Sequence, residues 1–197
     1  MDVYRLRAPI AAFVTIVLSL LTAPAAQADW DAKKLKLVRG ASTTLRQATT
    51  AAERDLKGKA YAAQASVNSD VVVYTVKVLV GEKSMAASYD GKTGKLTGTT
   101  PVSGENVALL KDFAKIKGSL LAAMRAAETT AKGKTFAAAF RRTGNKLLFE
   151  VDAAGRDDIE KDVVIDALTG KIRKVTEKSA DATTEATAQA PADQPAQ

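Results

Sequence analysis

Apolar and polar positions alternate most regularly over residues 71–80. The residues on one face of this segment are all apolar or aromatic: Val72, Tyr74, Val76, Val78 and Val80. A two-residue period of this kind predicts a β-strand with one buried face. A similar alternation at Leu147, Phe149 and Val151 predicts a second strand of the same type.

A helical spacing of apolar residues precedes each of these strands. The first helix is predicted to begin after Thr44, with Gln47 as its capping-box partner, and to stop at Gly58. The second is predicted to begin after Ser119 and to stop at Gly133. Because both apolar stripes are thin and rich in alanine, we expect each helix to lie close against a sheet.

Weaker patterns predict the other strands. Short strands are expected to start near Tyr61 and Phe136, and last short strands at 95–96 and 171–172. A third strand has Met85, Ala87 and Tyr89 on one face, matched by Lys161, Val163 and Ile165 in the second half. In this register Lys161 faces inward, or its side chain extends along the apolar surface until the amino group reaches solvent.

The sequence contains an internal repeat. AAERDLKGKAYAA at 51–63 and AAETTAKGKTFAA at 126–138 are identical at eight of thirteen positions. Further on, residues 90–95 align with 166–171 at a shift of 76 instead of 75, which one inserted residue explains. Chance similarity of alanine-rich segments would not also reproduce the glycine, lysine and aromatic positions in order.

The repeat predicts an α+β fold of two tandem modules, each with one α-helix packed on a small antiparallel β-sheet. The first repeat, with an N-terminal lead-in, is expected at 29–98, and the second at 116–176. A linker is expected at 99–115. A disordered tail rich in Ala, Thr, Pro and Gln is expected at 177–197, because it offers little apolar surface to bury.

The first residues predict a signal peptide over 1–28. Arg5 and Arg7 precede an apolar run at 8–23, and an A-x-A site ends at Ala28. The run is shorter than the roughly 20 apolar residues that a membrane span needs, which argues against a retained anchor. We therefore expect a periplasmic protein with no membrane span after cleavage, and release to the medium stays open.

The chain of 197 residues contains neither histidine nor cysteine. This excludes Cys–His and Ser–His catalytic pairs, His or Cys zinc sites and disulfides. An enzyme would have to use a perturbed Asp, Glu or Lys. We therefore expect no enzyme and no cofactor, and we assign no catalytic, cofactor-binding or metal-binding residues. The residues that bind a partner are not identified by the sequence.

Three acidic or glycine-containing motifs have structural explanations. Lys132–Thr135 is similar to the end of a phosphate-binding loop, but the required glycine is replaced by Glu128. Asp90 and Asp166, each before Thr-Gly-Lys, are expected to bond the backbone of a tight turn. The acidic cluster lacks the glycine and terminal glutamate of a calcium loop, and an exposed hairpin is favoured: Asp157, Asp158, Glu160 and Asp162.

The net charge of +7 suggests attraction to polyanions. Basic residues include the pair Arg141 and Arg142. Aromatic residues are few and no nucleic-acid module is present, so a nucleic-acid partner is not expected. An exported protein would instead meet anionic lipid or polysaccharide, for which we expect weak attraction.

The repeat resembles the PepSY domain. The resemblance rests on an alanine-rich helix ending in glycine, a Tyr-x-Val strand and a closing Asp-x-x-Thr-Gly-Lys. In the first copy these are 51–58, 73–76 and 90–95. In the second they are Ala126–Gly133, Leu148–Val151 and Asp166–Lys171. It covers about 41–98 and 116–175. PepSY domains occur in propeptides of secreted metallopeptidases and in separate periplasmic or membrane-linked proteins.

The resemblance implies a non-catalytic module that acts by protein contact. The leading hypothesis is a periplasmic protein-binding module, an inhibitor or regulator of a peptidase that docks by a sheet edge or loop. Any target would be a separate exported chain, because no peptidase domain follows in this sequence. The alternative is a binder of a small ligand or envelope polyanion that uses the basic surface.

Overall fold

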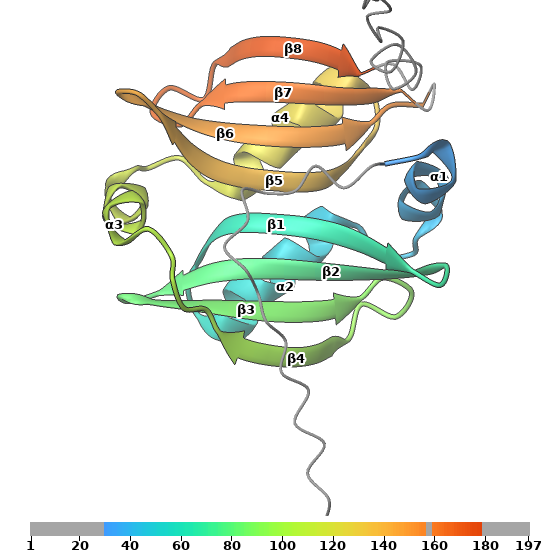
Figure 1. Cartoon of the computed structure of the whole chain (residues 1–197), viewed down its shortest axis with the longest axis horizontal. Helices are drawn as coiled ribbons and strands as arrows, with labels where there is room; N and C mark the ends of the chain where they lie inside the picture. The colour runs from blue at the N-terminus through green and yellow to red at the C-terminus, as the bar shows by residue number, and fades with distance from the viewer. Residues whose placement is uncertain (1–29, 157–158, 179–197) are drawn as a thin grey trace, which may run out of the picture.

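The computed structural model describes residues 30–156 and 159–178, which form helices on one antiparallel sheet (Figure 1). In the first half the elements are α1 (Ala32–Gly40), α2 (Leu45–Leu56), β1 (Lys59–Asn68), β2 (Val71–Val80), β3 (Lys83–Asp90) and β4 (Leu96–Pro101). In the second half they are α3 (Val107–Lys115), α4 (Leu120–Ala131), β5 (Lys134–Thr143), β6 (Lys146–Ala154), β7 (Glu160–Asp166) and β8 (Ile172–Lys178). The predicted signal peptide lies outside the described residues, as does the tail from 179 onward.

All eight strands form one sheet in the order β4-β3-β2-β1-β5-β6-β7-β8. Each half is an antiparallel meander, and the two meanders meet where β1 pairs with β5. The α+β class is therefore confirmed, whereas the small separate sheets of the prediction are replaced by one continuous sheet. Pairing of β1 with β5 provides hydrogen-bond partners for backbone N–H and C=O groups that would be unpaired at the edges of two separate meanders.

The joint between β1 and β5 is built from small side chains. Ala63 lies opposite Ala138, flanked by the pairs Ala62 with Ala139 and Gln64 with Ala137. Because Ala138 occupies the position of Ala63 in the 75-residue repeat, the pairing is related to itself by an approximate twofold axis. Alanine gives little hydrophobic signal, and so the alternation in the sequence did not reveal this contact.

The same order of elements occurs in both halves, beginning with a short helix. Helices α1 and α3 start 75 residues apart, after the N-caps Asp31 and Asn106. The segment 99–115, expected to be a linker, instead contains the end of β4 and the whole of α3. Similarly, the lead-in contains α1. Each of these nine-residue helices buries only two residues of its own, which is too short a stripe to recognise in the sequence.

Several strands are longer than expected. β1 and β5 each run for ten residues, although only short strands were expected there. β4 and β8 have six and seven residues where two were expected, and β8 continues to Lys178, inside the predicted tail. β1 and β5 are rich in alanine, and β4 and β8 are mostly exposed, so pairing with a neighbour extends these strands beyond what their side-chain pattern indicates.

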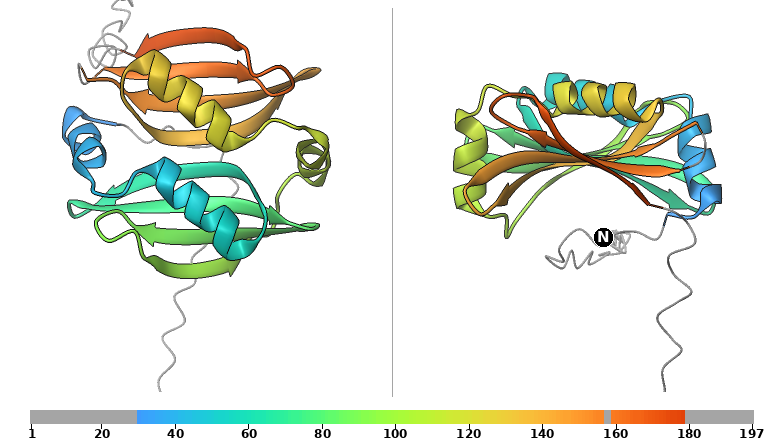
Figure 2. Two further views of the ribbon diagram at one scale, coloured as in Figure 1. Left: turned by 180° about the vertical axis from the view of Figure 1, so that it is seen from behind. Right: turned by 90° about the horizontal axis from the view of Figure 1, so that it is seen from above.

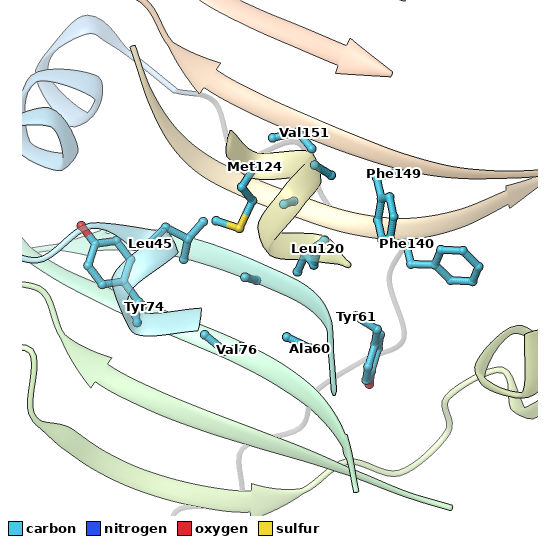
Figure 3. Close-up of a cluster of buried hydrophobic side chains, with 14 of the residues drawn as sticks. Leu45, Ala60, Tyr61, Tyr74, Val76, Leu120, Met124, Phe140, Phe149 and Val151 are labelled. Atoms are coloured by element: carbon cyan, nitrogen blue, oxygen red, sulfur yellow. The ribbon is translucent and has the colours of Figure 1, made fainter. Parts of the chain in front are cut away.

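Helices α2 and α4 lie next to each other on one face of the sheet, and no described helix covers the opposite face (Figure 2). α1 and α3 lie at the two ends of the joint (Figures 1 and 2). The core between the long helices and the sheet is continuous across both halves (Figure 3). Large side chains at its centre are Leu45, Tyr74, Leu120, Met124, Phe140 and Phe149.

The caps of the long helices follow the prediction at the start and differ at the end. Thr44 and Gln47 form the expected capping box, and Ser119 caps α4. The left-handed residues that end these helices are Lys57 and Lys132, both with φ of 52°, and not the glycines that follow. Gly58 and Gly133 are instead required by the close approach of the carbonyls of Leu79 and Ala154.

Each half also holds the short helix of the other half. Lys59 Nζ of β1 donates to the Ile116 carbonyl at the end of α3, at 2.6 Å. Lys134 Nζ of β5 donates to the Arg39 carbonyl near the end of α1, also at 2.6 Å. A cation near the C-terminus of a helix is favourable, so the exchange fastens the two halves together.

Candidate functional site

The two turn aspartates are structural, as the sequence predicts. Asp90 Oδ1 accepts from the Thr93 amide at 2.7 Å and from the Thr93 hydroxyl at 2.8 Å. Asp166 makes the same bonds with Thr169. Arg173 also bonds Asp166, which, with the turn's amides, holds the pKa of that carboxyl well below its usual range.

The acidic hairpin contains a group that the sequence did not single out. Burial raises the pKa of Asp152 to about 6, and Glu160 and Asp162 add to this effect while Lys178 opposes it. Lys178 Nζ lies 2.6 Å from Glu160 and 3.5 Å from Asp152. Within residues 30–156 and 159–178, no group of acidic side chains is arranged to hold a metal ion. The cluster fastens β8 to β7 and β6. Asp157 and Asp158 lie outside the described residues.

Three other basic residues of the second half, Arg141, Arg142 and Lys161, are engaged in ion pairs. Arg142 pairs with Asp112 of α3, and Arg141 lies 3.7 Å from Glu150. Lys161 is only 17% exposed and reaches Glu177 at 3.1 Å, which agrees with its expected inward position. The Arg141–Arg142 pair therefore does not form an open basic patch.

A basic pocket lies where the C-terminal ends of α1 and α4 meet the loop between β6 and β7. Its lining residues are Arg39, Glu128, Thr129, Lys132, Gly133, Lys134 and Arg156, around a volume of about 620 Å³. The residues that resemble a phosphate loop form a helix end and the start of β5, as predicted. They nevertheless place two lysines in this pocket, which the sequence reading did not foresee.

The two outer edges of the sheet offer a second kind of site. β4 and β8 each pair with a single neighbour, so each has one row of backbone groups without a strand partner among the described residues. Such an edge can pair with an extended segment of another chain. The chemistry of the two edges differs.

The edge at β4 is uncharged. Its sequence is LTGTTP, every residue is exposed, and a side chain added at Gly98 would meet no atom within 4 Å. The edge at β8 has the sequence IRKVTEK. Charged side chains on an edge strand disfavour pairing with other chains. β4 is therefore the edge better suited to accept an added strand.

Comparison with known families identifies part of the second half. Residues 117–176 match PepSY, the peptidase propeptide and YPEB domain. The PepSY match spans α4 and nearly all of β5 to β8. It indicates a propeptide-like or regulatory module of a type that is typically non-catalytic, and it is in keeping with an exported protein. The sequence resemblance to PepSY is thereby confirmed for the second half.

Two solved structures are similar to the chain. A candidate lipoprotein from Clostridium difficile 630 has 15% identity and a TM-score of 0.43, covering 72% of this chain and 97% of its own. The YpmB protein from Bacillus subtilis has 18% identity and a TM-score of 0.31, covering 67% and 96%. The search of curated proteins finds no significant match. No helix among residues 30–156 and 159–178 is long and apolar enough to cross a bilayer.

Proposed function

We propose that the protein is an exported, non-catalytic protein-binding module that docks on another exported protein, such as a peptidase, through the β4 edge. Export is inferred from the signal peptide predicted over 1–28, and the periplasm is the proposed compartment. Two features support a role in protein contact: the PepSY match of residues 117–176 and the exposed, uncharged β4 strand.

We also propose that the chain carries two copies of one PepSY-like unit. The order of elements, the 75-residue spacing of α1 and α3, and the matching caps at Thr44 and Ser119 support this division. Since the halves share one sheet, β4 and β8 are the outer strands among residues 30–156 and 159–178. Of these, the uncharged β4 is the proposed docking strand.

The proposed mode of docking is steric. An extended segment of the partner would add to β4 by backbone hydrogen bonds, and the neighbouring sheet would then block access to the partner's cleft. Backbone pairing tolerates varied side chains, so specificity would come from the side chains that flank the edge. No residue of this chain has to perform chemistry in this mode.

The β4 edge can be tested by transferring charges from β8. Thr97 and Gly98 occupy the positions of Arg173 and Lys174 in the repeat, so Thr97→Arg with Gly98→Lys gives β4 these two positive charges of β8. Full-length protein with and without this change would be used to capture partners from the periplasmic fraction. Captured proteins would be quantified by mass spectrometry and any peptidase tested for inhibition.

The expected result is one or a few exported proteins captured at high salt and lost with the β4 variant. A matched control, Thr50→Arg with Thr130→Lys, adds the same charge on α2 and α4 and should retain capture. Both control positions are exposed. Equal capture by the β4 variant, or no specific capture by the unmodified chain, would contradict the proposal.

A further inference from the structure

We infer that the turn between β7 and β8 attaches the protein to the surface of an anionic lipid bilayer, with Leu168 inserted among the acyl chains and nearby lysines bound to the headgroups. The turn lies next to β8, at the edge of the sheet opposite to β4. The inference therefore does not depend on the proposed docking function, and the attachment leaves β4 accessible. Three features support it: the exposure of Leu168, the ordered turn that presents it and the charges around it.

The apolar residues of this hairpin are unusually exposed. Leu168 is the most exposed large apolar side chain in the described part of the chain, at 68%, and Ile172 and Val175 on β8 are each 43% exposed. Ile172 pairs with Ile165 and Val175 with Val163. Because both partners are buried in the core, Ile172 and Val175 lie on the α4 side of the sheet. One exposed leucine is common on protein surfaces, whereas an apolar group that continues along a hairpin indicates a binding surface.

The turn holds Leu168 in its exposed position. Asp166 Oδ1 accepts from the amides of Leu168 and Thr169, at 3.1 Å and 2.8 Å. The Gly170 amide donates to the Asp166 carbonyl at 2.8 Å, and the Asp166 amide donates to the Lys171 carbonyl at 2.9 Å. Because these bonds already order the backbone, little further entropy is lost when the leucine side chain enters a bilayer.

The first half shows that the turn does not need an apolar residue at this position. Lys92 occupies the position of Leu168 in the repeat. Asp90 nevertheless accepts the same bonds from the amides of Lys92 and Thr93, at 3.1 Å and 2.7 Å. The exposed leucine is therefore not required to complete the turn, and a role in binding accounts for it.

Three exposed lysines surround the turn. Lys171 belongs to it, and Lys146 precedes Leu147, whose carbonyl accepts from the Ala167 amide at 2.9 Å. Lys117 precedes a glycine that packs directly on the Ala167 carbonyl. Within residues 30–156 and 159–178, none of these three side chains makes a hydrogen bond or an ion pair. Their charges are therefore available to anionic headgroups.

The acids at this end of the second half are already neutralised. Asp166 binds Arg173 at 2.7 Å, and Asp112 of α3 pairs with Arg142. The β6–β7 loop and the end of β8 lie at the other end of the strands (Figure 1). Glu82, in the β2–β3 turn, is four strand spacings or roughly 19 Å from β7, beyond the screening length of about 8 Å. The surroundings of Leu168 are therefore positively charged.

This combination of features fits a bilayer better than other exported partners. A polyanionic polysaccharide would bind the lysines but would give Leu168 no apolar surroundings. A convex turn does not enclose a small ligand, whereas its tip can enter the boundary between headgroups and acyl chains. Apolar burial and attraction to anionic lipid then act together. Each contribution is small, so the expected attachment is weak and reversible.

The test is co-sedimentation of the protein, purified from the periplasmic fraction, with phosphatidylcholine vesicles that contain or lack phosphatidylglycerol. The protein should bind only the anionic vesicles. Leu168→Gln should weaken binding about tenfold, because burial of a leucine side chain is lost. Lys146→Gln with Lys171→Gln should weaken it at least about tenfold, because two charges that attract anionic lipid are removed.

Matched control variants carry the same changes in the first half. Val71 is 51% exposed beside the β1–β2 turn but follows Asp70, and Lys92 and Lys95 belong to the β3–β4 turn. Both turns lie at the opposite end of the sheet (Figure 1). Val71→Gln, and Lys92→Gln with Lys95→Gln, should therefore each change binding less than about twofold.

A second measurement reports insertion directly. The fluorescence of Leu168→Trp should shift to shorter wavelength on anionic vesicles and should be quenched by lipids with brominated acyl chains. Val71→Trp should show neither effect. Trp30, the only native tryptophan, gives the same background in both variants.

Binding to anionic vesicles that depends on both Leu168 and the lysine pair supports the inference. Unchanged binding of Leu168→Gln would show attraction of surface charge alone and would overturn it. Absence of binding to anionic vesicles, or equal losses in the control variants, would overturn it as well. Capture of a protein that depends on Leu168, without binding to vesicles, would show that the turn recognises a protein instead.

Discussion

The first and second halves of the molecule share a frame but differ at its outer parts. Both have a short helix, a capped long helix and a four-stranded meander, and their helices end at Lys57 and Lys132 with the same left-handed backbone. They differ in the charge of their edge strands and in the arginines around the end of α4. The shared elements therefore determine the fold, whereas these outer parts can vary and take part in binding.

The largest loss of stability is expected from a substitution in the core, at a position where the two halves differ. Phe140 contacts the rings of Phe113 and Phe149, at centroid distances of 5.1 Å and 5.7 Å, and the first half has Ala65 at the same position. Phe140→Ala should lower the free energy of unfolding by about 3–5 kcal/mol, because it leaves a cavity in the shared core. Chemical denaturation would measure the loss.

The matched control for this change is Gln64→Ala, on the neighbouring strand β1 at an exposed position. Its effect should stay within about 0.5 kcal/mol. A loss below about 1 kcal/mol for Phe140→Ala would mean that this ring is not packed between Phe113 and Phe149 as the structure shows.

The glycines after the long helices give the next largest effect. Gly58→Ala and Gly133→Ala should each cost about 1–3 kcal/mol by overpacking, because the added methyl group meets the carbonyl of Leu79 or Ala154. The approach is closer at Gly133, so its variant should be the less stable. Gly40→Ala, where the methyl group meets no atom within 4 Å, is the control. If Gly58→Ala and Gly133→Ala both left the thermal midpoint unchanged, these glycines would not be required by the close carbonyls.

A pH-dependent difference is expected from Asp152, whose counterpart in the first half is Lys77. The raised pKa of about 6 means that the folded protein keeps this proton at a pH where the unfolded chain has released it. The free energy of unfolding therefore falls as the pH rises from about 4 to about 6. Asp152→Asn removes this loss and should stabilise the protein by about 1–2 kcal/mol near pH 7.5, with little change near pH 4.

Urea denaturation of the Asp152→Asn variant at both pH values would measure this effect. Glu150→Gln, which removes a charge from the same strand, serves as the control. An equal change at both pH values for Asp152→Asn would contradict the role assigned to burial of this carboxyl.

The smallest effect is expected from the lysines exchanged between the halves. Lys59→Met and Lys134→Met should each cost about 1 kcal/mol, because each removes a cation from the end of a short helix. Amide exchange should show α3 loosened by the first change and α1 by the second. If each change instead loosened the short helix of its own half, the contact of each lysine with the other half would be contradicted.

The sequence predicts the parts of the fold whose signals are local. The caps at Thr44 and Ser119, the strand at 71–80 and the turn aspartates all follow from neighbouring residues, and the structure confirms them. The sequence did not predict the pairing of β1 with β5, because alanine packs equally well in a helix, a strand or a loop and so gives no periodic signal.

The candidate sites depended on contacts between distant segments, which the sequence alone does not contain. Arg39 and Arg156 meet across 117 positions, and only the placement of α1 against the second half brings them together. The docking edge likewise required the strand order, because the composition of β4 alone does not reveal that it is an outer strand. Without the strand order, the polar residues of β4 indicate only a linker.

β1 and β5 join the halves into one sheet and leave β4 as its uncharged outer edge. Amide hydrogen exchange of the free protein, resolved residue by residue, tests this arrangement. The joint-facing amides within 62–64 and 137–139 should be among the slowest to exchange, and the outer amides of β4 and β8 among the fastest. If the joint-facing amides exchanged as fast as those of β4, the halves would be separate sheets, and the assignment of β4 as the docking edge would fail.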